Sequence, residues 1–230
     1  MAFGRRKQKE QVPPLPVVDW RGVREFTIGT VERKNQMERK KTIEGPRAIR
    51  VPGRNGWEQT FAPCAYFAGK YGDLGPVLYE DVKFQRVLCV LDDPLERDGE
   101  DVYHVRDAQS EIVGSIRRIP PVNRLSRHTW RIDQPGCPTV IGRNKWAKKG
   151  PKEVAGVALE SAVGFLARSS GDGSYSRDRE LEWKTPDGEF VMNSCGYGGH
   201  DMRLEIEIEV RWLDRRIAFA YAMLRDIPAP

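Results

Sequence analysis

The sequence predicts a mainly β protein in which a closed or strongly curved antiparallel β-barrel encloses a hydrophobic C-terminal α-helix, with one additional helix near residues 153–168. Three observations lead to this fold class. The segment WLDRRIAFAYAMLRDI (212–227) is apolar from Ile217 to Leu224 and charged on both sides, and a helix that is apolar all round must be surrounded by protein. Residues 201–212, DMRLEIEIEVRW, alternate apolar and charged side chains, which is typical of a strand with one buried face. Three further segments repeat a hairpin-like pattern.

The composition is that of a folded globular protein. A chain of 230 residues that is 39% hydrophobic and 9% aromatic can form one large domain or two small ones. The basic N-terminal stretch leads into no apolar region, so we expect no secretory signal, and no apolar run approaches the roughly 20 residues that span a bilayer. The four cysteines form no C-x-x-C pair, which favours reduced thiols: Cys64, Cys89, Cys137 and Cys195. Reduced thiols indicate a cytoplasmic protein, which could also associate peripherally with a membrane.

The N-terminal part of the chain divides into a tail and the start of the domain. Residues 1–20 combine basic residues with three prolines, which predicts a mobile tail. Residues 21–82 are expected to form a strand plus an irregular part of the same domain as the barrel at 83–230. Within this part the pattern is strand-like over 23–31, indicates an exposed loop or short helix over 32–41, and is rich in turn formers over 45–76.

The hairpin pattern recurs three times after a predicted core strand at residues 83–91. Segments 102–119, 129–146 and 181–196 each place an aromatic-bearing strand before an Asp, a short turn and a second strand. The corresponding aromatic and acidic residues are Tyr103, Trp130 and Trp183, and Asp107, Asp133 and Asp187.

Two predicted helices complete the expected elements. Residues 154–168 place small and apolar side chains at helical spacing, although Gly156 and Gly164 weaken the pattern. For the closing helix, a curved sheet that wraps it would bury every side, whereas a helix lying across an open sheet would leave one side partly wet. The enclosed arrangement is the one we predict, with the open sheet as its alternative.

The chain resembles the tubby C-terminal-like superfamily, which includes phospholipid scramblases, tubby proteins and the plant LURP-one-related proteins. The resemblance covers about residues 83–227 and depends on YHVRDAQSEIVGSI, WRIDQPGCPTVIG and LEIEIEVRWLDRRIAFAYAMLRD. It implies a barrel, twelve-stranded in the family, threaded by a hydrophobic C-terminal helix that residues 214–227 would supply here. Tubby proteins hold phosphoinositide head groups with basic side chains on the barrel. Scramblases act at membranes with calcium and acylated cysteines, and this chain lacks both their cysteine cluster and an acidic calcium segment.

The charge distribution predicts where a ligand binds. Residues 117–152 contain ten basic residues against the single acid Asp133, while the flanking stretches are acidic. Cations on one face attract anionic lipid at about 1 kcal/mol each, and Trp146 among them suits a membrane interface or base stacking. The candidate lipid- or anion-binding residues are Arg117, Arg118, Arg124, Arg127, Arg143, Lys145, Trp146, Lys148, Lys149 and Lys152. The alternative is a solvated face balanced by acidic strands.

The sequence therefore favours a non-enzymatic binding protein whose partner is anionic lipid head groups or an acidic protein surface. A structural component that docks through its basic N-terminal tail is the alternative, and nucleic-acid binding is third. Cys195, His200 and Asp201 offer a thiol nucleophile and a base, but they surround GYGG, which a hairpin turn explains. We expect no catalytic residues, no metal and no cofactor.

Overall fold

The computed structural model of the chain describes residues 13–35, 42–67, 76–120, 129–144, 180–196 and 204–226. The predicted helix at 153–168 lies outside these residues. Within them the elements are η1 (Trp20–Gly22), β1 (Glu25–Asn35), β2 (Thr42–Asn55), β3 (Glu58–Phe67), β4 (Val77–Tyr79), β5 (Val87–Leu91), β6 (Leu95–Arg97), β7 (Glu100–Arg106), β8 (Ile112–Ile119), β9 (Thr129–Asp133), β10 (Val140–Asn144), β11 (Leu181–Lys184), β12 (Phe190–Gly196), β13 (Leu204–Ile208) and α2 (Arg215–Asp226).

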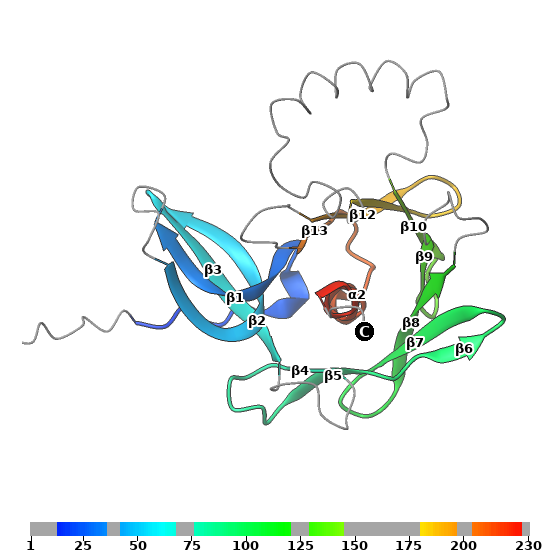
Figure 1. The fold of residues 1–230 in the computed structure, drawn as a ribbon, viewed down its shortest axis with the longest axis horizontal. Helices are drawn as coiled ribbons and strands as arrows, with labels where there is room; N and C mark the ends of the chain where they lie inside the picture. Colours follow the sequence, from blue (N-terminus) through cyan, green and yellow to red (C-terminus); the bar gives the residue numbers. More distant parts are fainter. Residues whose placement is uncertain are drawn as a thin grey trace, which may run out of the picture.

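The strands form a closed antiparallel barrel, as the sequence predicts. Their order is β5-β4-β3-β2-β1-β13-β12-β11-β10-β9-β8-β7-β6, and pairing of β5 with β7 closes the ring. Since β6 pairs only with β7 among the described strands, it lies outside the ring, which leaves twelve strands in the barrel. Figure 1 shows the ring with α2 seen end on.

The three predicted hairpins and the alternating strand are confirmed. β7 pairs with β8, β9 with β10 and β11 with β12, each through a short turn. In β13 the burial alternates as the sequence requires, with Leu204, Ile206 and Ile208 buried and the intervening glutamates exposed. The strand ends at Ile208, so it is shorter than the pattern over 201–212 suggested.

The apolar side chains of α2 are buried against the inner faces of several strands. Every residue from Ile217 to Met223 is at most 1% exposed, and the helix contacts β1, β5, β7, β8 and β13. The Tyr221 ring makes edge-on contacts with Trp130 and Trp183, at centroid distances of 5.5 and 4.7 Å. At about 1.5 to 3 kcal/mol for each large side chain, this burial makes α2 a major source of stability.

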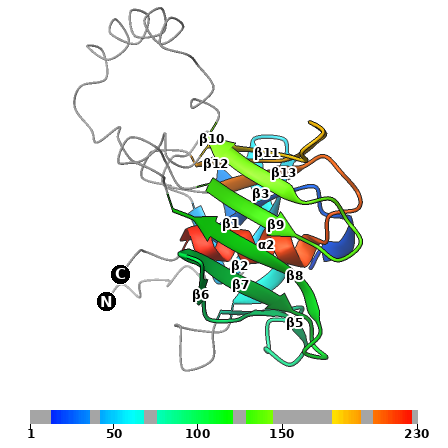
Figure 2. The same ribbon diagram turned by 90° about the vertical axis from the view of Figure 1, so that its right-hand side faces the viewer.

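The two ends of the barrel differ, and we name them after the ends of α2. At the Arg215 end lie the turns β7–β8, β9–β10 and β11–β12, and the chain that leads from β13 into α2. At the Asp226 end β8, β10 and β12 finish and β9, β11 and β13 begin. In Figure 2 the Asp226 end is on the left, where the arrowheads of β8 and β10 point.

Hydrogen bonds tie the described segments together at the Arg215 end. Gln134 Nε2 donates to the Trp212 carbonyl (3.0 Å), and Gln134 Oε1 accepts from the Asp214 amide (2.8 Å). The Asp214 carboxylate in turn accepts from the Arg216 amide (2.9 Å), which caps the first turn of α2. These bonds fix how the chain runs from β13 into α2.

Arg215 links the N-terminal part of the chain to the start of α2. Its side chain is 6% exposed, and its guanidinium donates to the carbonyls of Val23 (2.6 Å), Leu213 (2.6 Å) and Val210 (3.2 Å). Burial lowers the pKa of Arg215, helped by the nearby charge of Arg24. The three hydrogen bonds that Arg215 donates compensate for the removal of its charge from water.

Strands β1, β2 and β3 belong to the ring, and they also project from it as a lobe at the left of Figure 1. β1 pairs with β2 and β2 with β3, and the end of β1 also pairs with the start of β3. Arg50, 1% exposed, lies among these strands and donates to the carbonyls of Gly29 (2.9 Å), Phe61 (2.9 Å) and Pro46 (2.5 Å). The lobe is therefore closed around a buried cation.

The lobe corrects two predictions. The irregular connection expected over 45–76 is wrong for residues 45–67, which belong to β2 and β3 apart from the turn between them. The loop or short helix expected over 32–41 is wrong for residues 32–35, because β1 continues to Asn35. Pro46, Pro52 and Gly53 do not end β2. The pairing of this strand is irregular, with a register shift opposite Gly29 of β1 and another after Ile49 of β2.

Candidate anion-binding site

Three of the ten predicted site residues lie in the described part of the chain. Arg117 and Arg118 are on β8, and Arg143 is on β10. The other seven fall outside it: Arg124, Arg127, Lys145, Trp146, Lys148, Lys149 and Lys152.

Arg117 belongs to a balanced cluster of charges. It faces Arg131 across the β8–β9 pair, and its guanidinium lies 3.1 Å from Asp133 and 3.8 Å from Glu100. Asp133 also pairs with Arg131 at 2.8 Å. Two cations are thus offset by two carboxylates, which favours the solvated-face interpretation for this residue.

Arg118 lies at the rim of the Asp226 end. It faces Trp130 across the β8–β9 pair, and its guanidinium is 3.9 Å from Asp101, a pair in which both side chains are about 40% exposed (41% and 42%). A pair this exposed and this long contributes little to stability.

Two further cations at this rim were not among the predicted site residues. The Arg225 guanidinium lies 5.9 Å from the centroid of the Trp130 ring, and Arg47 forms an ion pair with Asp226. Cations near a helix C-terminus interact favourably with its dipole. The sequence shows Arg225 as the basic residue after the apolar run of α2. Arg47 is on β2, far away in sequence, and only the fold places it at the rim.

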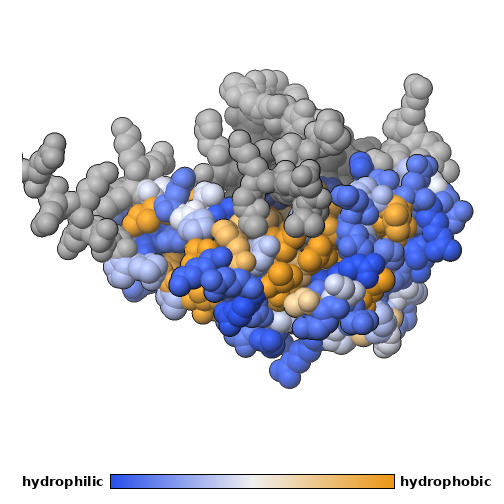
Figure 3. All heavy atoms as spheres, turned by 90° about the horizontal axis from the view of Figure 1, so that it is seen from below, coloured by the Kyte–Doolittle hydropathy of each residue, from blue (hydrophilic) through white to orange (hydrophobic). Residues whose placement is uncertain are grey.

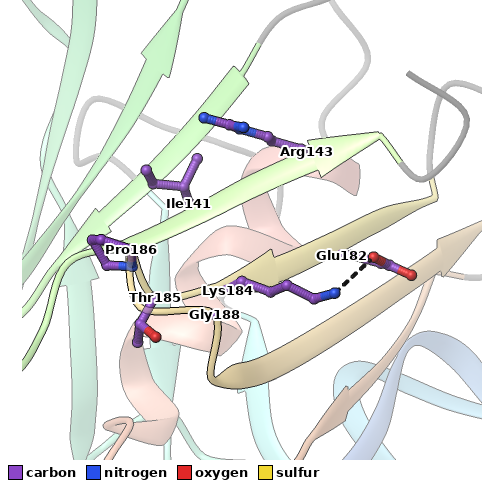
Figure 4. Close-up of a pocket in the computed structure, with 7 residues that line it drawn as sticks. All are labelled: Ile141, Arg143, Glu182, Lys184, Thr185, Pro186 and Gly188. Carbon is purple, nitrogen blue, oxygen red and sulfur yellow. Dashed lines mark ion pairs between the residues drawn. The ribbon is translucent and has the colours of Figure 1, made fainter. Parts of the chain in front are cut away.

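Arg143 lines a shallow pocket on the outer face of β10 and β11. The pocket has a volume of about 180 Å³, and Figure 4 shows its lining: Ile141, Arg143, Glu182, Lys184, Thr185, Pro186 and Gly188. Lys184 pairs with Glu182 at 3.3 Å and lies 5.6 Å from the Phe190 ring. Arg143 is exposed and lies opposite Glu182 across the β10–β11 pair, without a salt bridge to another described residue.

Arg118 and Arg143 lie at the same end of the barrel. Each is next to a strand end, since Ile119 pairs with Thr129 and Asn144 pairs with Leu181, all at the Asp226 end. In the sequence, Arg124 and Arg127 lie between Ile119 and Thr129, and Lys145 follows Asn144.

The side of the barrel formed by β4 and β5 is different in character. Figure 3 shows hydrophobic side chains gathered on this side of the molecule, and Val82 and Phe84 in the β4–β5 turn are exposed. The turn is ordered by Asp81: burial raises its pKa, but hydrogen bonds from the amides of Arg86, Lys83 and Gln85 outweigh this and lower it. The turn has as many acids as cations, so it does not suit an anionic ligand.

The cysteines at core positions are poor nucleophiles. Burial raises the pKa of Cys64 and Cys89 from 9.0 to about 12, so both are neutral thiols near pH 7. Cys195 lies on β12, whereas His200 and Asp201 fall outside the described residues. The described residues contain no group of three or more His, Cys, Asp or Glu that could hold a metal ion.

Comparisons with protein-family models, with curated proteins and with solved structures find no match to this chain. No helix in the part of the chain that the structure describes has the length and apolar character to cross a membrane.

Proposed function

We propose that this chain is a non-enzymatic, tubby-like binding protein that holds anionic lipid head groups at the Asp226 end of its barrel. In this proposal α2 is the hydrophobic plug of the barrel, and the cations of residues 117–152 form the binding surface with Arg118 and Arg143 as its described part. The protein would then act at the cytoplasmic surface of a membrane. An acidic protein surface has the same charge and is the competing ligand.

The observation that supports the proposal is the common position of Arg118 and Arg143. Both lie at the Asp226 end, where the pair of Arg118 with Asp101 is long and exposed and Arg143 has no ion pair among the described residues. By contrast, Arg117 is balanced by Asp133 and Glu100, so we place it outside the binding surface. The barrel fold and the resemblance do not by themselves identify a ligand, because function depends on the site.

Liposome flotation tests the proposal. The native protein is expected to float with vesicles that contain phosphatidylserine or phosphoinositide and to stay behind with neutral phosphatidylcholine vesicles. The double variant Arg118→Glu/Arg143→Glu should weaken binding at least about 25-fold, since each cation near an anionic surface is worth about 1 kcal/mol. Comparing the two anionic lipids at equal vesicle charge shows whether a phosphoinositide is preferred.

The matched control is Arg21→Glu/Arg211→Glu, which changes the net charge equally at two exposed positions toward the Arg215 end. Equal weakening by both double variants would mean that only total charge matters, and the proposed site would be wrong. No flotation of the native protein with any anionic vesicle would remove the lipid function altogether.

A further inference from the structure

The tip of the lobe presents a large aromatic side chain to water. Trp57 is 65% exposed, the highest value among the exposed large hydrophobic residues in the described part of the chain. It lies far from the core, at the turn that joins β2 to β3. Exposing an indole costs free energy, and Trp at a protein surface is typical of sites that contact a partner or a membrane interface.

The backbone holds Trp57 at the apex of this turn. Asn55 pairs with Glu58, so the turn has two central residues, Gly56 and Trp57. Gly56 has φ of +57°, whereas Trp57 is absent from the residues with positive φ. This is the pattern of a type II′ turn, in which glycine occupies the first central position and the second residue lies at the tip. Trp57 is therefore presented by a regular hairpin turn.

Two cations lie on one face of the lobe beside this tip. Arg54 on β2 faces Gln59 on β3, and Gln59 faces Lys34 on β1. Side chains directly opposite each other in antiparallel strands point to the same face. Arg54 also donates from Nε to the Gly56 carbonyl (3.2 Å), which holds its guanidinium at the turn. An indole and two cations thus share a convex tip.

A third cation, Arg33 on β1, lies in the lobe and donates to the Pro13 carbonyl (3.0 Å). Glu58, which follows Trp57 in the sequence, pairs with Arg33 at 3.2 Å. The indole at the lobe tip is therefore accompanied by three cations and one paired acid.

We propose that the lobe tip is an interfacial anchor for anionic membranes, in which Trp57 enters the head-group layer and Arg54 and Lys34 contact lipid phosphates or carboxylates. Trp is enriched at this depth because its ring is amphipathic, and cations snorkel to the anionic surface. A nucleic acid is less suited, because single-strand binding uses a positive groove with successive aromatic side chains, and this tip is convex with one.

This anchor is separate from the site at the Asp226 end. In the ring, β2 and β10 are separated by β1, β13, β12 and β11, and the lobe is on the opposite side of Figure 1 from β9 and β8. The inference goes beyond the proposed function and does not require Arg118 or Arg143 to bind lipid.

The experiment combines flotation with fluorescence quenching on the full chain, using phosphatidylcholine vesicles with and without phosphatidylserine. Trp57→Ala should weaken binding to anionic vesicles about ten-fold, because an indole of roughly 200 Å² loses part of its burial at about 25 cal/mol per Å². Arg54→Glu/Lys34→Glu should weaken it about 25-fold or more. Brominated lipid should quench the native protein more than Trp57→Phe, which localises the contact to this one indole.

Leu95→Ala is the matched control, since Leu95 is 59% exposed on the short strand β6 amid acidic residues, and it should bind like the native chain. Each variant is also measured in the Arg118→Glu/Arg143→Glu background. There Trp57→Ala should lower the affinity for anionic vesicles by the same factor, whether or not the background substitutions lower it themselves. Quenching that is equal in the native protein and Trp57→Phe would overturn the anchor. So would a Trp57-dependent affinity for single-stranded RNA together with unchanged vesicle binding by Trp57→Ala.

Discussion

Gly142→Ala is the most direct test of how the barrel interior is packed. A Cβ at this position would lie 2.7 to 2.8 Å from three atoms of the Trp183 ring, closer than any real contact. The ring cannot move easily, because Trp183 is fully buried and packs edge-on against Tyr221 of α2. Overpacking of this kind costs about 1 to 3 kcal/mol. Replacing glycine also restricts the unfolded chain, which stabilises the protein by about 0.4 to 1 kcal/mol and offsets part of this cost. We expect a net loss of about 1 to 2 kcal/mol in the free energy of unfolding.

The assay is urea unfolding followed by circular dichroism, with thermal unfolding as a second readout, where the loss corresponds to a Tm lower by about 3 to 8 °C. Gly29→Ala is the control, because a Cβ there meets nothing within 4 Å and its φ is not positive. Trp183→Phe should relieve part of the clash, so the loss from Gly142→Ala should shrink in that background. If Gly142→Ala unfolds like Gly29→Ala, the packing described for the indole is wrong.

Two further predictions concern other parts of the core. Arg215→Met should lower the free energy of unfolding by about 2 to 4 kcal/mol, because three buried carbonyls lose their donor, and urea unfolding that shows a change below about 1 kcal/mol would contradict this role. Stability should also fall in alkali: burial raises the pKa of Cys64 and Cys89 from 9.0 to about 12, so the folded state keeps protons that the unfolded chain releases. Their contribution is complete below pH 9.0 and is lost as pH rises toward about 12, by about 1.4 kcal/mol per pH unit and thiol. Urea titrations at pH about 8 and about 10 should show a smaller fall in Cys64→Ala/Cys89→Ala, and an equal fall would refute it.

The parts of the fold that the sequence predicted are those with a local period. The alternation from Leu204 to Ile208 and the apolar run of α2 each fix one element by themselves, and the three hairpins follow from turns with a strand on both sides. The lobe has no such signal. β2 contains prolines and glycines that usually end strands, and it remains a strand because Arg50 satisfies carbonyls where the strands curl.

The candidate site shows the same limit. The run of cations over 117–152 was visible in the sequence, but which of them lack acidic partners depends on the strand register. Asp133 lies within the run and neutralises Arg117 and Arg131, while Glu100 comes from the preceding hairpin. Arg47 joins the rim from a strand far away in sequence. Trp57 is one of several aromatic residues in the N-terminal part of the sequence. Its exposure at a hairpin turn is seen only in the structure.

The direction of α2 constrains how an anion could bind at the Asp226 end. A helix C-terminus carries a partial negative charge, so this end is unlike the helix N-termini that bind phosphate through backbone amides. Arg225 lies against the Trp130 ring, and Arg47 pairs with Asp226. Binding at this end must therefore depend on flexible cationic side chains such as Arg143, whose interactions salt screens strongly. The anchor at the lobe has an apolar component from Trp57 that salt does not screen. Raising the ionic strength should accordingly weaken the cationic contacts at both sites, while the lobe keeps the part of its affinity that comes from Trp57.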